Sequence, residues 1–237
     1  MKSLCGGVAL AALLCLAWPT LAASEESGLP TVAELLAGHG QVQAASGAFS
    51  DIVTPLHGDA EGAPGDITGN RLEVRFWLQR PHYYHFIVSE GDDEDRQHYL
   101  ANGRQRWQVE VVLGDAIVDI QPYRHDDPFA RIQRLLQLSE AELAQDFTWE
   151  GVLALGEGAP AALPHIKLPA AWRLGLLLIP ESPEMRSEVR RILLAFGDDR
   201  RLLGMVIDDT HDNRRLVRLK NLEFHESLDP ALFVWQD

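Results

Sequence analysis

Apolar residues alternate with polar ones along much of the chain, and the clearest example lies between residues 72 and 80. Leu72, Val74, Phe76 and Leu78 occupy every second position, so in a strand their side chains share one face. Arg80 continues this phase and is followed at once by a proline, which cannot donate to a sheet ladder. The row predicts a strand with one buried face, and it places a guanidinium at or just beyond the end of that face.

The same alternation, interrupted by turn residues, predicts a series of further strands. Residues 114–115 (Gly-Asp) join two of them in the manner of a tight hairpin. We expect strands over residues 48–56, 72–79, 83–89, 97–100, 107–113, 116–123, 148–155, 165–168, 173–179, 188–196, 201–208 and 215–224.

Three short segments have helical spacing instead. Thr31 and Glu34, and likewise Ser139 and Glu142, have the spacing of a capping box, and Asp127 can cap a helix that starts at Pro128. The apolar side chains that share a face of the first two helices are Leu35 and Leu36 near the N-terminus, and Phe129, Ile132, Leu135 and Leu136 in the middle of the chain.

Many sequential strands with short connections favour an antiparallel sheet that curls or closes into a barrel. A helix that is apolar on one face must bury that face against another part of the protein. The simplest arrangement is a curled sheet with the helices across its mouth.

The first residues have the pattern of a secretory signal peptide. One lysine precedes an apolar run over residues 7–18, which is short for a membrane span, and small residues follow. We expect residues 1–23 to be removed, with cleavage after Ala22 or Ala23, leaving a single domain over residues 24–237. The alternative is a retained membrane anchor.

The net charge and the positions of the cysteines exclude several kinds of partner and of covalent modification. Loss of Lys2 takes the formal charge from −14 to −15, which argues against nucleic acid and against anionic lipid surfaces as partners. Both cysteines, Cys5 and Cys15, lie in the leader, and Leu14 stands where a lipid-attachment site requires a small residue. The exported chain should therefore be soluble, not lipidated and without a disulfide, and we expect it to be a monomer.

Residues that could carry chemistry are scattered. His82 and His85 are three apart, so on a strand they point to opposite faces and do not form a metal site. The run from Asp208 to Asp212 could hold calcium weakly, but a polar hairpin turn explains it better. Carboxylates such as Glu110 and Asp119 could pair in a cleft as a hydrolase would need, yet the outer face of strands explains them equally well. We expect no catalytic residue, no metal and no cofactor.

The guanidinium of Arg80 needs hydrogen-bond acceptors if it lies at an apolar face. Backbone carbonyls at the end of a helix across the barrel mouth could supply them, which would make Arg80 a latch for a lid. The alternative is that the strand ends at Gln79 and Arg80 reaches solvent.

Short motifs spread over most of the exported chain resemble the LolA family of periplasmic carriers that escort lipoproteins to the outer membrane. The matching segments are residues 78–81 (Leu-Gln-Arg-Pro) with 83–86, residues 178–180 (Leu-Ile-Pro), residues 202–209 and residues 221–233. The resemblance implies an incomplete, half-open antiparallel barrel covered by a lid of short α-helices, with a hydrophobic cavity between them.

The resemblance also implies a periplasmic location and a role for several residues. Arg80 would bond to the lid helices, Leu72, Val74, Phe76 and Leu78 would line the cavity, and acyl chains of lipoproteins would be the cargo. An inner-membrane ABC-type lipoprotein-releasing complex and a LolB-like outer-membrane receptor would be the partners. A relative that carries a glycolipid or another lipid, or one that senses envelope lipoproteins, is an alternative within the same fold. From other classes, a carboxylate-dependent hydrolase and a module that binds a protein through a sheet edge remain open.

Overall fold

The computed structural model describes residues 28–55, 71–90, 96–124, 128–137, 140–156 and 168–236. The predicted leader lies outside these residues. In the described part the first six strands are β1 (Ala44–Pro55), β2 (Arg71–Gln79), β3 (Tyr83–Glu90), β4 (Arg96–Asn102), β5 (Gln105–Val112) and β6 (Asp115–Pro122). The later strands are β7 (Phe147–Thr148), β8 (Val152–Ala154), β9 (Leu174–Pro180), β10 (Val189–Phe196), β11 (Leu202–Asp209) and β12 (Asn213–His225).

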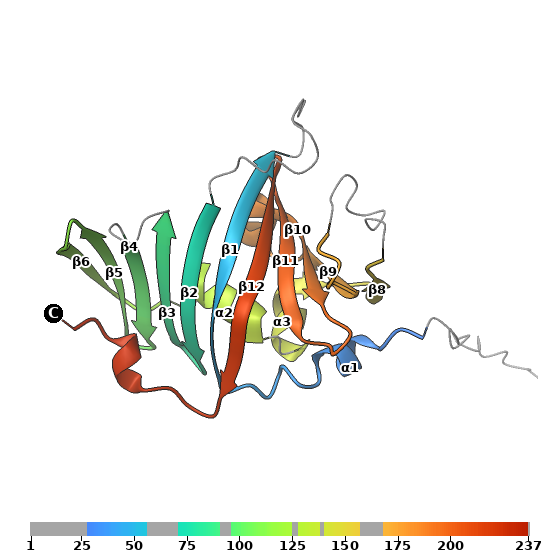
Figure 1. Ribbon diagram of the computed structural model, residues 1–237, viewed down its shortest axis with the longest axis horizontal. Helices are drawn as coiled ribbons and strands as arrows, with labels where there is room; N and C mark the ends of the chain where they lie inside the picture. Colours follow the sequence, from blue (N-terminus) through green and yellow to red (C-terminus); the bar gives the residue numbers. More distant parts are fainter. Residues whose placement is uncertain are drawn as a thin grey trace, which may run out of the picture.

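These strands form one antiparallel sheet in the order β6-β5-β4-β3-β2-β1-β12-β11-β10-β9-β7, with β8 also paired to β9 (Figure 1). Neighbours in sequence are mostly neighbours in the sheet, and the long pairing of β1 with β12 joins its two halves. The described end strands β6 and β7 are not paired with each other, so the sheet is open. The mainly β fold expected from the sequence, an incomplete antiparallel barrel with short helices, is confirmed.

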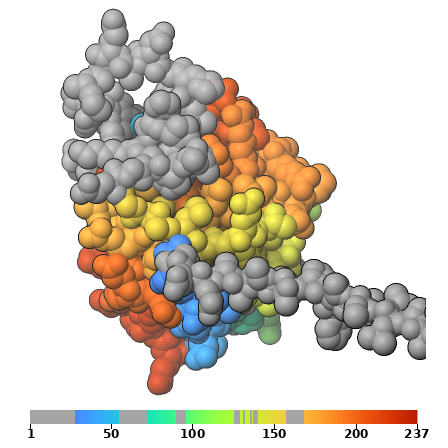
Figure 2. All heavy atoms as spheres, turned by 90° about the vertical axis from the view of Figure 1, so that its right-hand side faces the viewer, coloured from blue at the N-terminus to red at the C-terminus, as the bar shows by residue number. Residues whose placement is uncertain are grey.

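The helices in the described part are α1 (Val32–Leu36), α2 (Pro128–Gln137), α3 (Glu140–Asp146), α4 (Pro183–Glu188) and the 3-10 helix η1 (Pro230–Phe233). Both α2 and α3 lie on the same side of the sheet, behind it in Figure 1. On the surface shown in Figure 2, the segment of α3 (yellow) lies next to α1 (blue), which it contacts. We call the helix-covered side of the sheet the inner face and the opposite side the outer face.

The main core lies between the inner face and the helices. Alternate residues of β2, β3, β9 and β10 pack there against α1, α2 and α3, as strand periodicity requires. A second apolar cluster, which includes Trp172, Leu193 and Val206, covers part of the outer face. Within the described residues no helix is both long enough and apolar enough to cross a membrane.

Most predicted elements are present, with shifted ends. The capping box of α1 is formed, since the side chain of Thr31 accepts from Glu34 N while the Glu34 carboxylate accepts from Thr31 N at 2.8 Å. The single strand expected over 148–155 is instead divided into β7 and β8. Both pair with β9, and between the two pairings the chain has three residues, 149–151, where β9 has two, so the register shifts by one residue.

Two further expectations differ from the structure. Helix α4 was not expected, although Ser182 caps it and Pro183 opens it in the usual way. Of the strand expected over 165–168, residues 165–167 lie outside the described part and Leu168 is not in a strand.

Candidate functional site

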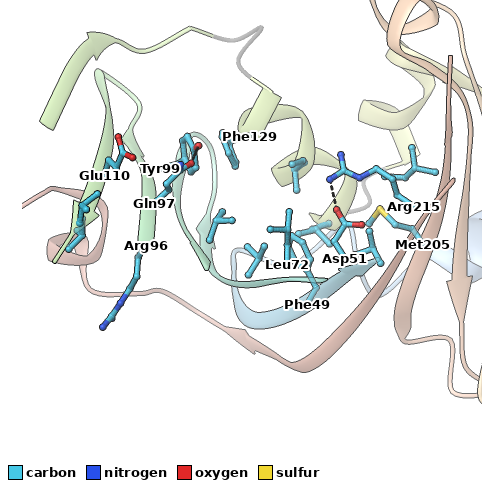
Figure 3. Close-up of a pocket in the computed structure, with 18 residues that line it drawn as sticks. Phe49, Asp51, Leu72, Arg96, Gln97, Tyr99, Glu110, Phe129, Met205 and Arg215 are labelled. Carbon is cyan, nitrogen blue, oxygen red and sulfur yellow. Dashed lines mark hydrogen bonds and ion pairs between the residues drawn. The ribbon is translucent and has the colours of Figure 1, made fainter. Parts of the chain in front are cut away.

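A cavity of about 670 Å³ lies between the inner face and helix α2. Strands from both halves of the sheet form its floor, and α2 lies over it (Figure 3). Its apolar lining consists of Phe49, Leu72, Val74, Val88, Val111, Val112, Phe129, Ile132, Leu136, Met205, Ile207 and Val217. Its polar lining consists of Asp51, Arg96, Gln97, Tyr99, Glu110 and Arg215.

The predicted apolar row of β2 divides between this cavity and the closed core. Leu72 and Val74 line the cavity. Phe76 and Leu78 share their face, but both are fully buried and are not among the lining residues. The alternation therefore identified the correct face, and the cavity occupies only the half of the row that is distant from Arg80.

The predicted lid residues also divide into two groups. Phe129, Ile132 and Leu136 of α2 line the cavity, and the Phe129 ring stacks on Tyr99 with centroids 4.1 Å apart. The side chain of Leu135 lies outside the described part of the structure. Leu35 and Leu36 of α1 are buried in the main core and do not line the cavity.

Arg80 lies just after the end of β2, and its guanidinium connects three parts of the chain. Nε donates to the carbonyl of Val42, between α1 and β1, at 3.1 Å. Nη1 donates to Glu142 Oε1 of α3 at 3.0 Å. The sequence predicts that Arg80 binds backbone carbonyls at the end of a helix. This prediction is wrong, because α3 offers a side-chain carboxylate instead. The side chains of Arg80 and Glu142 are 20% and 33% exposed, so the pair is largely shielded from water.

A second contact ties α2 to the same turn. Gln133 is buried, and its Nε2 donates to the carbonyls of Gln79 at 3.0 Å and of Tyr83 at 3.2 Å. Helices α2 and α3 are thus both hydrogen-bonded to the turn between β2 and β3. The sequence offered a signal for Gln133, because it lies four residues after Phe129 and three before Leu136, on the apolar face of the helix that was expected to cover the sheet.

An ion pair lies within the cavity wall. Asp51 of β1 and Arg215 of β12 both project from the inner face, and Arg215 Nη2 donates to Asp51 Oδ2 (Figure 3). Sequence reasoning missed this pair. Each residue interrupts an apolar row, Asp51 two residues after Phe49 and Arg215 two residues before Val217, as Arg80 does two residues after Leu78.

The histidines and the Asp208 turn have other roles. His85 is on the outer face beside His98, with His85 Nε2 3.1 Å from His98 Nδ1, whereas the ring of His82 lies near Tyr123. Burial, reinforced by the neighbouring His98, lowers the pKa of His85 to about 4. Burial opposes ionisation of Asp208, but hydrogen bonds from Arg214 and Arg191 outweigh it, and its pKa is lowered.

The remaining turn residues and the two candidate carboxylates make local polar contacts or line the cavity. Asp209 accepts from the backbone of His211 and Asn213, as a polar hairpin turn does. Of the two carboxylates considered for a hydrolase, Glu110 lines the cavity and Asp119 accepts from Gln121 Nε2 at 2.6 Å. The described residues contain no group of three side chains arranged to hold a metal ion.

No family model matches this chain, and no curated protein matches it by sequence. Solved structures do match. A LolA superfamily protein from Nitrosomonas europaea is 11% identical, with 87% of this chain and 99% of that chain covered and a TM-score of 0.41. A DUF1329 family protein from Desulfovibrio piger is 8% identical, with 86% and 94% covered and a TM-score of 0.40. A β-barrel-like protein of the domain of unknown function DUF1849 from Brucella abortus is 11% identical, with 78% and 99% covered and a TM-score of 0.33. The matching structures thus include a member of the superfamily that the sequence motifs resemble.

Proposed function

We propose that this protein is a periplasmic carrier that holds the acyl chains of a lipoprotein in the cavity between its sheet and helix α2. The observation that carries the proposal is the apolar lining of that cavity, to which the sheet and α2 both contribute. Its volume of about 670 Å³ lies within the range of roughly 300–1,000 Å³ that small-molecule sites occupy.

Burial of hydrocarbon alone can drive such binding. Each CH₂ group that leaves water contributes roughly 0.8 kcal/mol, so a chain of about 14 carbons supplies on the order of 10 kcal/mol before the costs of association. A carrier therefore needs no catalytic group, and we expect none in this protein.

The helices over the cavity supply the means of access. Helix α2 is connected to the sheet through Gln133 and α3 through Arg80, and both contacts converge on the turn after β2. Such hydrogen bonds can be exchanged for ligand contacts when the helices move away from the sheet. In this account Arg80 is the latch of the lid, and transfer partners in the inner and outer membranes would act on the same movement.

Binding of a fluorescent fatty acid tests the cavity directly. Ile132→Asp places a charge in the cavity wall and should weaken binding at least about tenfold, because ligand burial would then desolvate a carboxylate. Ile132→Trp keeps the wall apolar and fills part of the volume, so it should also weaken binding while the protein remains folded. The matched control is Ile120→Asp on β6, where the side chain is 55% exposed and outside the cavity lining.

The proposal fails if the parent binds no acyl probe, or if both Ile132 variants bind it as the parent does. Thermal unfolding of each variant separates loss of the site from loss of the fold. A carrier of another lipid would bind the fatty acid but would not accept a lipidated peptide. That comparison distinguishes lipoprotein cargo from a different acyl ligand.

A further inference from the structure

The Asp51–Arg215 pair occupies an unusual position for charged side chains. In the sheet register Asp51 lies opposite Leu72 on β2 and Val217 on β12, both of which line the cavity. The Asp51 side chain is 6% exposed, whereas that of Arg215 is 41% exposed. A carboxylate is thus held inside the apolar wall and its partner extends along the cavity from the neighbouring strand (Figure 3).

The pair is incomplete. Arg215 Nη2 bonds to Asp51 Oδ2, but Asp51 Oδ1 and Arg215 Nε are buried and have no hydrogen-bond partner among the residues that the structure describes. An unsatisfied acceptor and an unsatisfied donor therefore lie in one polar cluster. Unpaired buried groups of this kind are costly, and a ligand that pairs them removes the cost.

The same sheet contains a completed pair for comparison. On the outer face, Asp208 accepts from Arg214 through both carboxylate oxygens at 2.7 and 2.9 Å, and from Arg191 at 2.7 Å. That carboxylate, which is 1% exposed, is satisfied by protein groups alone. Asp51 differs from it, because its Oδ1 accepts no hydrogen bond from the described residues. The Arg80–Glu142 pair also leaves a buried donor and acceptor, Arg80 Nη2 and Glu142 Oε2, without a described partner, but neither residue lines the cavity.

The chemistry of the open positions defines the ligand. A group that both donates and accepts, such as an amide or a hydroxyl, can donate to Asp51 Oδ1 and accept from Arg215 Nε. An ester can only accept, a hydrocarbon can do neither, and a free carboxylate has no proton to donate to Asp51.

We infer that the Asp51–Arg215 pair selects acyl chains that carry a neutral donor–acceptor group, an amide or a hydroxyl, over chains that carry an ester or a carboxylate. The inference rests on the proposed function, since it assumes that an acyl chain enters this cavity. It adds the class of head group that the cavity recognises.

Two ligands of equal chain length test the preference. Calorimetry would compare dodecanamide with methyl dodecanoate, with 1-dodecanol as a second donor–acceptor ligand. The parent should bind the amide and the alcohol on the order of tenfold or more tightly than the ester, because only they pair both open positions.

Variants locate the preference. Replacing both partners, Asp51→Leu with Arg215→Leu, should bring the amide and ester affinities together while ester binding persists, since it leaves no uncompensated charge at the buried Asp51 position. Arg215→Lys retains the charge but has no Nε–H, so it should lose most of the preference even if the double variant does not fold. The control is Glu73→Gln with Lys220→Gln, which removes another β12 ion pair, at 3.0 Å and 41% exposed on both sides.

The outcomes are distinct. Equal affinity of the parent for amide and ester, or a preference that survives in the double leucine and Arg215→Lys variants, overturns the inference and leaves the acyl carrier intact. Binding of neither ligand overturns the proposed function, and the inference with it. A preference that the Glu73/Lys220 control also loses would show that the effect does not arise in the cavity.

Discussion

Replacement of Arg80 by leucine tests the lid most sharply. The substitution removes the hydrogen bond at 3.0 Å to Glu142 on α3 and the bond at 3.1 Å to the Val42 carbonyl. Leucine at this position extends the apolar row of β2 by one side chain and supplies no donor. If ligand entry requires α3 to leave the sheet, the parent must break these bonds and the variant need not.

The magnitude follows from the contacts. Hydrogen bonds to a charged group contribute about 1.5–3 kcal/mol when buried, and partial exposure of both partners, 20% and 33%, reduces the contribution of this pair. After this reduction we take the two hydrogen bonds of Arg80 together at roughly 1.5–3 kcal/mol, the value of a single buried bond to a charged group. The free energy of unfolding of the ligand-free variant should fall by that amount, which corresponds to a fall in Tm of roughly 3–12 °C for a chain of this size.

The same free energy should appear in binding with the opposite sign. Because the closed state alone loses the contact, the variant should bind a fluorescent fatty acid about 10- to 100-fold more tightly and should release it more slowly to acceptor vesicles. Equilibrium titration measures the first quantity and stopped-flow transfer the second.

Arg75→Leu is the matched control, because it removes an exposed guanidinium from the outer face of the same strand. A further check is Glu142→Gln, which should reproduce part of the effect and add little to Arg80→Leu. If Arg80→Leu binds and transfers the ligand at the parent's rates while losing stability, the contact is structural and the latch reasoning is refuted.

Three further predictions concern other parts of the molecule. Gln133→Leu should lower the free energy of unfolding by about 1–3 kcal/mol in a denaturant titration, because two strand-end carbonyls lose a donor; an unchanged midpoint would show that α2 does not depend on this bond. His85 has a folded-state pKa of about 4, below its unfolded value of 6.5, so the stability that it contributes is complete above pH 6.5 and is lost as the pH falls toward 4; His85→Gln should flatten that pH dependence, and equal slopes for both proteins would contradict the assignment. The exported protein should begin at Ala23 or Ser24 by intact mass, and a retained leader would contradict the cleavage prediction.

The sequence predicted those parts of the fold in which local pattern and tertiary environment agree. The alternation from Leu72 to Leu78 identified the buried face of β2 because a sheet with one covered face imposes a period of two. The capping box at Thr31 likewise depends only on neighbouring residues. Helix α4 has strong local signals in Ser182 and Pro183, but it is only 6 residues long and lies directly between two apolar strands, so it has too few turns to show a helical period.

The site was less predictable because it depends on contacts between distant residues. Nothing in the spacing of Arg80 and Glu142 shows that α3 brings a carboxylate to the end of β2. Asp51 and Arg215 are 164 positions apart, and their pairing depends on the register of β1 with β12. The sequence did contain a charged residue in the apolar row of β1 and another in that of β12. These two residues identify an ion pair only when the strands are known to be neighbours in the sheet.

The central claim is that the cavity holds an acyl chain, and native mass spectrometry of protein purified from the periplasm without detergent tests it most directly. The account predicts an adduct with the mass of an acyl-bearing species, released on denaturation and diminished in Ile132→Trp. Protein with no adduct, which also fails to acquire one from added lipidated peptide, would contradict the account.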